Sequence, residues 1–118
     1  MTWNGEERRK FVRIVFLCKV TVISYARTLF SHTEDIGEGG VKIVLRERLE
    51  PNTAVELNIM VGTEKIIKCK GEVRWINEKV ESLERQTHLF DVGIEFTEID
   101  DSDKLYIRKV VADTIKMD

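Results

Sequence analysis

The sequence predicts an all-β domain that is completed by one C-terminal helix. Apolar and polar residues alternate with period two through the middle of the chain, turn-forming residues bound each alternating stretch, and the period changes only near the end. About six short strands at this spacing favour a closed or nearly closed antiparallel barrel. Because no helical segment separates the strands, a parallel sheet is excluded.

The predicted strands follow one another at short intervals. The first two are the stretches IVFLCKVTVIS (residues 14–24) and ARTLFSHT (26–33). The next four alternate more strictly: GVKIVL (40–45), AVELNIM (54–60), IIKCKGEVRW (66–75) and FDVGIEF (90–96). Turns are expected at GEGG, EPNT, VGTE and INEKVESLERQ, which are rich in the residues that favour them.

Alternation also predicts which side chains face the barrel interior. In the fifth strand it places Ile67, Cys69, Gly71, Val73 and Trp75 on one face and charged residues on the other. An inward Trp75 is expected to pack in the core rather than to bind anything.

The end of the chain has helical rather than strand periodicity. The stretch DDSDKLYIRKVVADTIK begins with acidic and hydroxyl residues suited to capping, and it places Ile107, Val111 and Ile115 at i, i+4 and i+8. We therefore expect a single domain over residues 1–118, with a flexible basic arm at 1–13, a barrel at 14–99 and a C-terminal helix at 100–117.

Length and composition limit the class of protein. With 118 residues, of which 42% are hydrophobic, the chain can bury one core and no second domain is expected. Arg13 and Lys19 interrupt the aliphatic stretch near the start, so we expect neither a signal peptide nor membrane insertion. We expect a cytoplasmic location instead. Cys18 and Cys69 form no CxxC pair, which favours reduced core thiols over a disulfide, although a disulfide stays open.

Positive charge is concentrated near the start of the chain. The formal net charge is −2 and the isoelectric point about 5.8, yet residues 1–30 sum to +4 and residues 31–118 to −6. General nucleic-acid binders more often carry a basic isoelectric point, so we expect a small anion rather than nucleic acid as the partner.

Two short stretches stand out as candidate binding sites. ERRKFVR (residues 7–13) contains three arginines, whose planar forks match phosphate oxygens and the O6/N7 edge of guanine; the alternative is a solvated basic arm. TEDIGEGGV (33–41) has three glycines in four positions, which suggests close approach of the backbone to something; the alternative is a tight loop with a bulge.

In their order along the chain, these stretches resemble the signatures of the PilZ domain family. Arg9-xxx-Arg13 is similar to its RxxxR motif, and Asp35-x-Gly37-x-x-Gly40 to its (D/N)xSxxG motif, in the turn between the second and third predicted strands. GEVRW (71–75), VGIEF (92–96) and the closing helix extend the resemblance over nearly the whole chain. The resemblance implies a six-stranded antiparallel PilZ-type barrel and binding of the bacterial second messenger cyclic di-GMP.

The resemblance also implies a role for each site residue. Arg9 and Arg13 would anchor the ligand, Arg8 would add a phosphate contact, Asp35 would accept from the two donors of guanine, and Gly40 would let the loop come close. Gly37 stands where the family has serine, so one ligand hydrogen bond, worth roughly 0.5–1.5 kcal/mol, is missing.

Three functions remain open on the sequence alone. The leading one is a non-enzymatic receptor whose basic arm orders around cyclic di-GMP and relays the signal to a protein partner. The second is a degenerate PilZ-like adaptor that binds no nucleotide, as Gly37 favours. The third is a small barrel that binds single-stranded nucleic acid. No spacing indicates a metal site, a cofactor or a nucleophilic active site.

Overall fold

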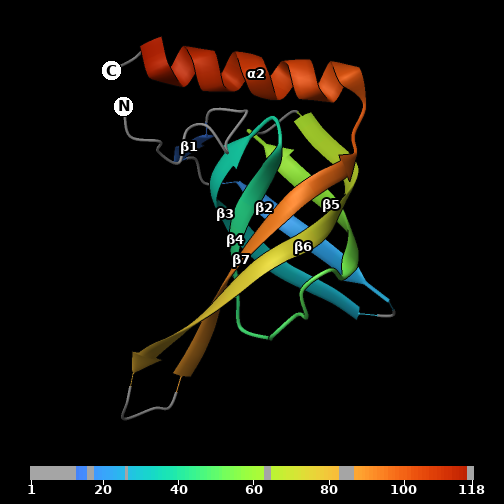
Figure 1. Cartoon of the computed structure of the whole chain (residues 1–118). Helices are drawn as coiled ribbons and strands as arrows, with labels where there is room; N and C mark the ends of the chain where they lie inside the picture. Colours follow the sequence, from blue (N-terminus) through green and yellow to red (C-terminus); the bar gives the residue numbers. More distant parts are fainter. Residues whose placement is uncertain (1–12, 16–17, 26, 63–64, 83–86, 117–118) are drawn as a thin grey trace, which may run out of the picture.

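The computed structural model describes residues 13–15, 18–25, 27–62, 65–82 and 87–116 (Figure 1). Within them lie seven strands and one helix: β1 (Arg13–Val15), β2 (Lys19–Ser24), β3 (Arg27–Gly37), β4 (Gly40–Leu45), β5 (Ala54–Val61), β6 (Lys65–Ser82), β7 (Thr87–Glu98) and α2 (Asp101–Lys116). The predicted all-β fold with a C-terminal helix is confirmed.

Six of the strands form a closed antiparallel ring. The order β3-β2-β5-β6-β7-β4 returns to β3 through the β3–β4 pairing, and β1 pairs with the last residues of β3, beyond the part that pairs with β2. The seventh strand arises because the predicted first strand, IVFLCKVTVIS, divides into β1 and β2. Both pieces pair with β3: β1 with its last residues, around Ile36, and β2 with its first, around Leu29.

The inward face of the barrel follows the alternation of the sequence in most strands. The predicted core positions of the third, fourth and last strands are buried or half-buried: Val41, Ile43, Leu45, Val55, Leu57, Ile59, Phe90, Val92, Ile94 and Phe96. Both cysteines are free and buried, and burial raises the pKa of Cys69 to about 12. The predicted place of both cysteines in the core is confirmed.

The β6–β7 hairpin is longer than the sequence indicated. INEKVESLERQ was expected to be a turn, but β6 continues through Ser82 and pairs with β7 as far as Thr87. Cross-strand side-chain pairs hold this extension, among them the ion pair of Lys79 with Asp91 at 2.9 Å. In Figure 1 the hairpin projects from the end of the barrel opposite α2.

Helix α2 lies across the other end of the barrel, next to β1 (Figure 1). The carbonyl of Asp100 accepts the amide of Lys104 at 2.9 Å, which starts the helix. Ile107 and Val111 are buried as predicted, but Ile115 is 51% exposed, because the helix has run past the core by its last turn. No helix in the described ranges has the length and apolar character needed to span a membrane.

Candidate functional site

Strand β1 brings the two signature stretches together. Its register pairs Arg13 with Gly37, Ile14 with Ile36 and Val15 with Asp35. The last residue of Arg9-xxx-Arg13 is therefore directly opposite the position that carries serine in the family pattern. The backbone of Arg13 is described here, whereas Arg8 and Arg9 lie outside the described residues.

The register of four strand pairings extends this contact into a row across the sheet. Val15 of β1, Asp35 of β3, Lys42 of β4, Gly93 of β7 and Trp75 of β6 are successive partners, and we call them the cross-strand row. The row faces away from the core, since Val15 is 83% exposed and Trp75 37% exposed. On β1, β4 and β7 the described residues next to the row are buried, as is Ile36 after Asp35 on β3: Ile14, Ile36, Val41, Ile43, Val92, Ile94.

Two β-bulges turn members of the row outward. The register shifts between Thr33 and Asp35 in β3, and again between Val73 and Trp75 in β6. Thr33 and Val73 are both fully buried, so uninterrupted alternation would also have pointed Asp35 and Trp75 inward. The prediction that Trp75 packs in the core is therefore wrong, and the extra residue at the bulge is the reason.

Trp75 lies against the glycine that faces it. A Cβ atom added to Gly93 would be 2.2 Å from Cε2 and Nε1 of the indole, so no larger residue fits there while the ring stays in place. An exposed indole held in this way can stack on a planar base. Sequence reasoning missed this surface, and no local pattern marks the bulge that creates it.

Lys42 supplies a cation to the row that the sequence analysis also missed. Its Nζ atom is 3.6 Å from Oε2 of Glu34, and its side chain is partly exposed. The alternation of β4 could have indicated it, because Lys42 is an outward position between the inward Val41 and Ile43, two residues after Gly40.

Gly40 begins β4 after the two-residue turn formed by Glu38 and Gly39. A Cβ atom at position 40 would be 2.2 Å from the carbonyl oxygen of Ile94, which belongs to the backbone of β7 and has little freedom to move. Close packing of two strands thus requires glycine here. This is a structural reason for the residue, alongside the ligand-related one that the resemblance implies.

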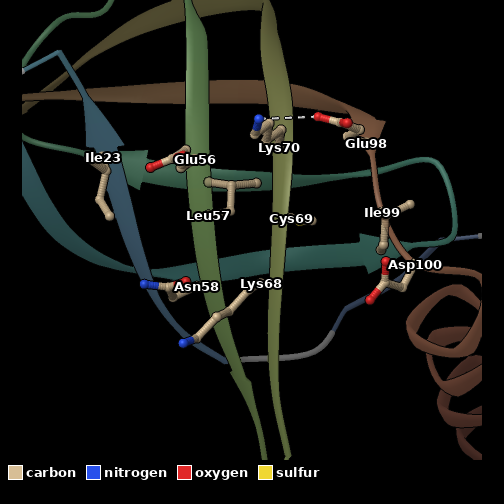
Figure 2. A pocket seen from close by; sticks show the side chains of 10 residues that line it. All are labelled: Ile23, Glu56, Leu57, Asn58, Lys68, Cys69, Lys70, Glu98, Ile99 and Asp100. Carbon is tan, nitrogen blue, oxygen red and sulfur yellow. Dashed lines mark ion pairs between the residues drawn. The ribbon is translucent and has the colours of Figure 1, made fainter.

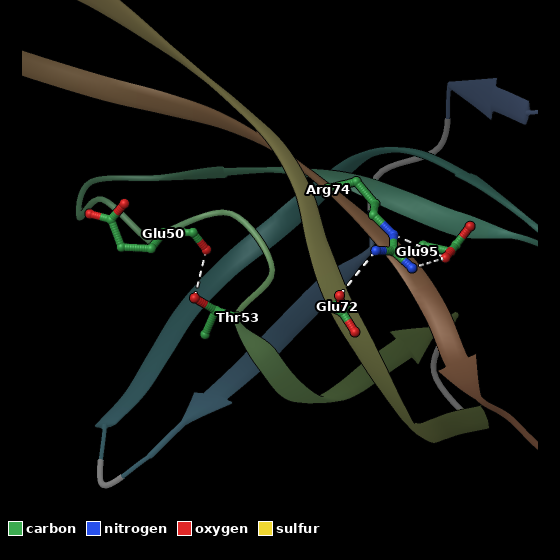
Figure 3. Close-up of polar contacts among 5 residues, drawn as sticks. All are labelled: Glu50, Thr53, Glu72, Arg74 and Glu95. Atoms are coloured by element: carbon green, nitrogen blue, oxygen red, sulfur yellow. Dashed lines mark hydrogen bonds and ion pairs between the residues drawn. The ribbon is translucent and has the colours of Figure 1, made fainter.

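Ion pairs occupy several carboxylates around the row. Figure 3 shows Arg74 between Glu72 and Glu95; its Nη1 is 3.0 Å from Oε1 of Glu72, and Nε donates to Oε1 of Glu95 at 3.0 Å. These contacts raise the pKa of Arg74, chiefly through the hydrogen bond to Glu95. On the other side, Arg108 of α2 binds Glu38 of the turn. Such pairing reduces the negative potential that an approaching anion would meet.

A separate hollow of about 480 Å³ opens elsewhere on the barrel (Figure 2). It lies over β2, β5 and β6 and the segment that follows β7, and the ion pair of Lys70 with Glu98 at 3.3 Å is on its rim. None of the residues predicted to bind a ligand lines it. Over the described ranges, no group of three or more His, Cys, Asp or Glu side chains could hold a metal ion.

Comparison with known proteins identifies one family. The PilZ domain sequence model matches residues 7–113, whereas a search of curated proteins gave no match. The PilZ domain of YcgR from Escherichia coli, solved with c-di-GMP, has a TM-score of 0.73 at 15% identity and covers 93% of each chain.

Two longer proteins have the same fold over part of their length. The Bacillus subtilis inhibitor of motility MotI (DgrA) gives a TM-score of 0.75 at 18% identity, covering 92% of this chain and 52% of its own. K. pneumonia MrkH in its apo state gives 0.78 at 14% identity, covering 99% and 53%. This chain therefore spans about half the length of these two, and identities this low establish the fold alone.

The contact between Gly40 and β7 generates a prediction about stability. We expect Gly40→Ala to lower the free energy of unfolding by about 3 kcal/mol or more, the upper end of the usual cost of overpacking, because the new methyl group would overlap the backbone carbonyl of Ile94. Urea denaturation followed by circular dichroism measures this. The control is Gly62→Ala, because a Cβ atom at position 62 would meet open space. The backbone there has a φ of 69°, so this substitution should cost only the backbone strain, about 1 kcal/mol. Equal losses in the two variants would contradict the steric argument.

Proposed function

The chain belongs to the PilZ domain family, and from this premise we propose that it is a non-enzymatic receptor for cyclic di-GMP. Relatives of the same fold were solved with this nucleotide, namely YcgR from Escherichia coli and MrkH from K. pneumonia. The residues present suit such a ligand, which combines two phosphates with two guanine bases.

One observation carries the proposal. The β1–β3 register puts Arg13 opposite Gly37, two residues from Asp35, so that both signature stretches meet at one outward edge of the barrel. Guanidinium groups bind phosphate oxygens and guanine edges in a bidentate manner, and a carboxylate accepts from two guanine donors. An exposed indole and a lysine lie in the same row, at Trp75 and Lys42.

Each signature residue has a proposed role in this site. Arg9 and Arg13 anchor the nucleotide and Arg8 adds a phosphate contact. Asp35 reads guanine, while Gly37 and Gly40 keep the β3–β4 turn low enough for the ligand to approach.

We propose that the signal is relayed by ordering of the chain that precedes β1. In this mechanism residues 6–13 close over the nucleotide against the turn at 35–40 and create a new surface for a protein partner. The ligand can shift the equilibrium only by its difference in affinity for the two states, so the arginines of the arm must bind more tightly when it is closed.

A second candidate is an adaptor of the same fold that binds no nucleotide. Gly37 favours it, because the hydroxyl group of the family pattern is absent at this position. The two candidates differ in a single measurable property, which is affinity for the ligand.

Isothermal titration calorimetry tests the proposed function. We expect cyclic di-GMP to bind with measurable heat and cyclic di-AMP to compete poorly, because adenine lacks the adjacent N1–H and 2-amino donors of guanine that Asp35 would accept from, and its N1 is itself an acceptor. Absence of heat and of competition at high ligand concentration would reject the receptor and leave the adaptor. Equal binding of the two nucleotides would remove Asp35 from its proposed role.

Substitution of the arginines provides the second test. Arg9→Ala and Arg13→Ala should each weaken binding of cyclic di-GMP by roughly tenfold to a hundredfold, because each removes charge-assisted hydrogen bonds. Lys19→Ala and Lys68→Ala are matched controls, since these exposed lysines lie on β2 and β6 and should have little effect. If all four variants lost affinity equally and slightly, diffuse electrostatics would account for binding.

Gly37 allows a test in which binding improves. Positive φ occurs at Tyr25, Asn52 and Gly62 among the described residues, and Gly37 is the extended last residue of β3. Serine can therefore adopt this backbone, and we expect Gly37→Ser to tighten binding several-fold through the hydrogen bond that it restores. Gly37→Ala should stay near the parent. Weaker binding by both variants in the same titration would mean that the site requires glycine.

A further inference from the structure

An ion pair connects helix α2 to the turn between β3 and β4. Both Nε and Nη2 of Arg108 donate to Oε1 of Glu38, at 3.0 and 2.8 Å. The two residues are 70 positions apart in the sequence, and the Glu38 side chain is only 16% exposed. The hydrogen bonds to Glu38 raise the pKa of Arg108, so its guanidinium is charged at any physiological pH.

The helix fixes the position of this guanidinium. Arg108 follows the buried Ile107, and Val111 is buried one turn further along. The helix also contacts β1 and β3, which carry Arg13 and Asp35. Docking of α2 on the barrel therefore determines whether Arg108 can reach the turn.

The turn is held from two sides. The amide of Phe96 in β7 donates to the carbonyl of Gly39 at 2.9 Å, and Arg108 binds the side chain of the preceding Glu38. β7 holds the turn through a backbone hydrogen bond, which most substitutions preserve. The helix holds it through one pair of side chains, which substitution can remove.

Glu38 would oppose binding of an anion if it stood alone. It lies next to Gly37 and three residues from Asp35, within the stretch that the proposed function assigns to a ligand with two phosphates. A carboxylate at this place repels phosphate, and a bound guanidinium cancels most of that repulsion. The affinity of the site should therefore depend on the Arg108–Glu38 pair.

We propose that Arg108 is a positioning residue for the ligand-binding turn and that its ion pair with Glu38 couples the docking of α2 to ligand binding. The inference rests on the proposed function. Coupling of this kind is reciprocal, so the ligand stabilises the docked helix by the same factor by which the docked helix increases affinity. Helix α2 is then an element through which occupancy of the site reaches a distant surface.

A double-mutant cycle tests the proposal with the full chain and cyclic di-GMP as the probe. Arg108→Gln should weaken binding roughly threefold to tenfold at low salt, the size expected for one charge within about a Debye length of a dianion. Glu38→Gln should bind as tightly as the parent or more tightly. The double variant should return to within about twofold of the parent, because removing Glu38 removes the need for Arg108.

Lys109→Gln is the matched control, since it removes the same charge from the adjacent exposed position of α2. We expect it to leave affinity near that of the parent. Thermal denaturation of each variant without ligand separates a loss of fold from a loss of affinity. Hydrogen exchange provides a second readout: the ligand should slow exchange of the α2 amides in the parent and do so less in Arg108→Gln.

The outcomes separate this inference from the proposed function. A parent that binds, with Arg108→Gln unchanged or no weaker than Lys109→Gln, would overturn the coupling and leave the receptor intact. A double variant as weak as Arg108→Gln would show that Arg108 does not act through Glu38, and it would overturn the proposal as well. A parent that does not bind would reject the receptor function and this inference with it.

Discussion

Two hydrogen bonds between Cys18 and Thr33 join the start of β2 to β3, and the arrangement of the candidate site depends on this contact. The amide of Cys18 donates to Oγ1 of Thr33 at 2.9 Å, and the amide of Thr33 donates to the carbonyl of Cys18 at 2.8 Å. Because Thr33 is fully buried, water could not replace either hydrogen bond if it were lost. The chain passes from β1 to β2 here, and β3 exchanges one partner strand for the other. Beyond this point β1 lies beside Asp35 and Gly37.

The β-bulges of this barrel place polar and aromatic side chains on its outer face while the core residues beside them stay buried. In a strand that alternates without interruption, the face that one side chain occupies determines the face of every other side chain. One extra residue in β3 and one in β6 reverse the alternation within the strand, so that Thr33 and Val73 stay buried while Asp35 and Trp75 reach the surface. Bulges concentrate near functional sites for this reason, since they re-aim a side chain at the cost of a locally disrupted ladder.

These features also explain how far the sequence could predict the structure. Alternation located the strands and the inward positions of β4, β5 and β7, because period two is uninterrupted there and each position depends only on its neighbours. It failed for Trp75, where an added residue changed the parity. It also failed for the long β6–β7 hairpin, because that extension is held by cross-strand pairs such as Lys79 with Asp91 rather than by apolar alternation.

Contacts between distant segments were beyond any reading of local pattern. The signature stretches could be recognised separately, and their meeting at Arg13 and Gly37 is a property of strand register. The pair of Arg108 with Glu38 joins residues 70 positions apart and leaves no trace in the spacing of either segment.

An acidic chain can still present a surface suited to an anion, and the described residues indicate how. The net charge of −2 is an average, and what a phosphate meets is the local potential, which falls off within about a Debye length. Near the cross-strand row, Glu34 is paired with Lys42, Glu38 with Arg108, and Glu72 and Glu95 with Arg74. Each pair fixes a loop or strand edge and also removes a repulsive charge. The carboxylates therefore contribute to the shape of the proposed site, while their partners limit the contribution that these carboxylates make to its electrostatic potential.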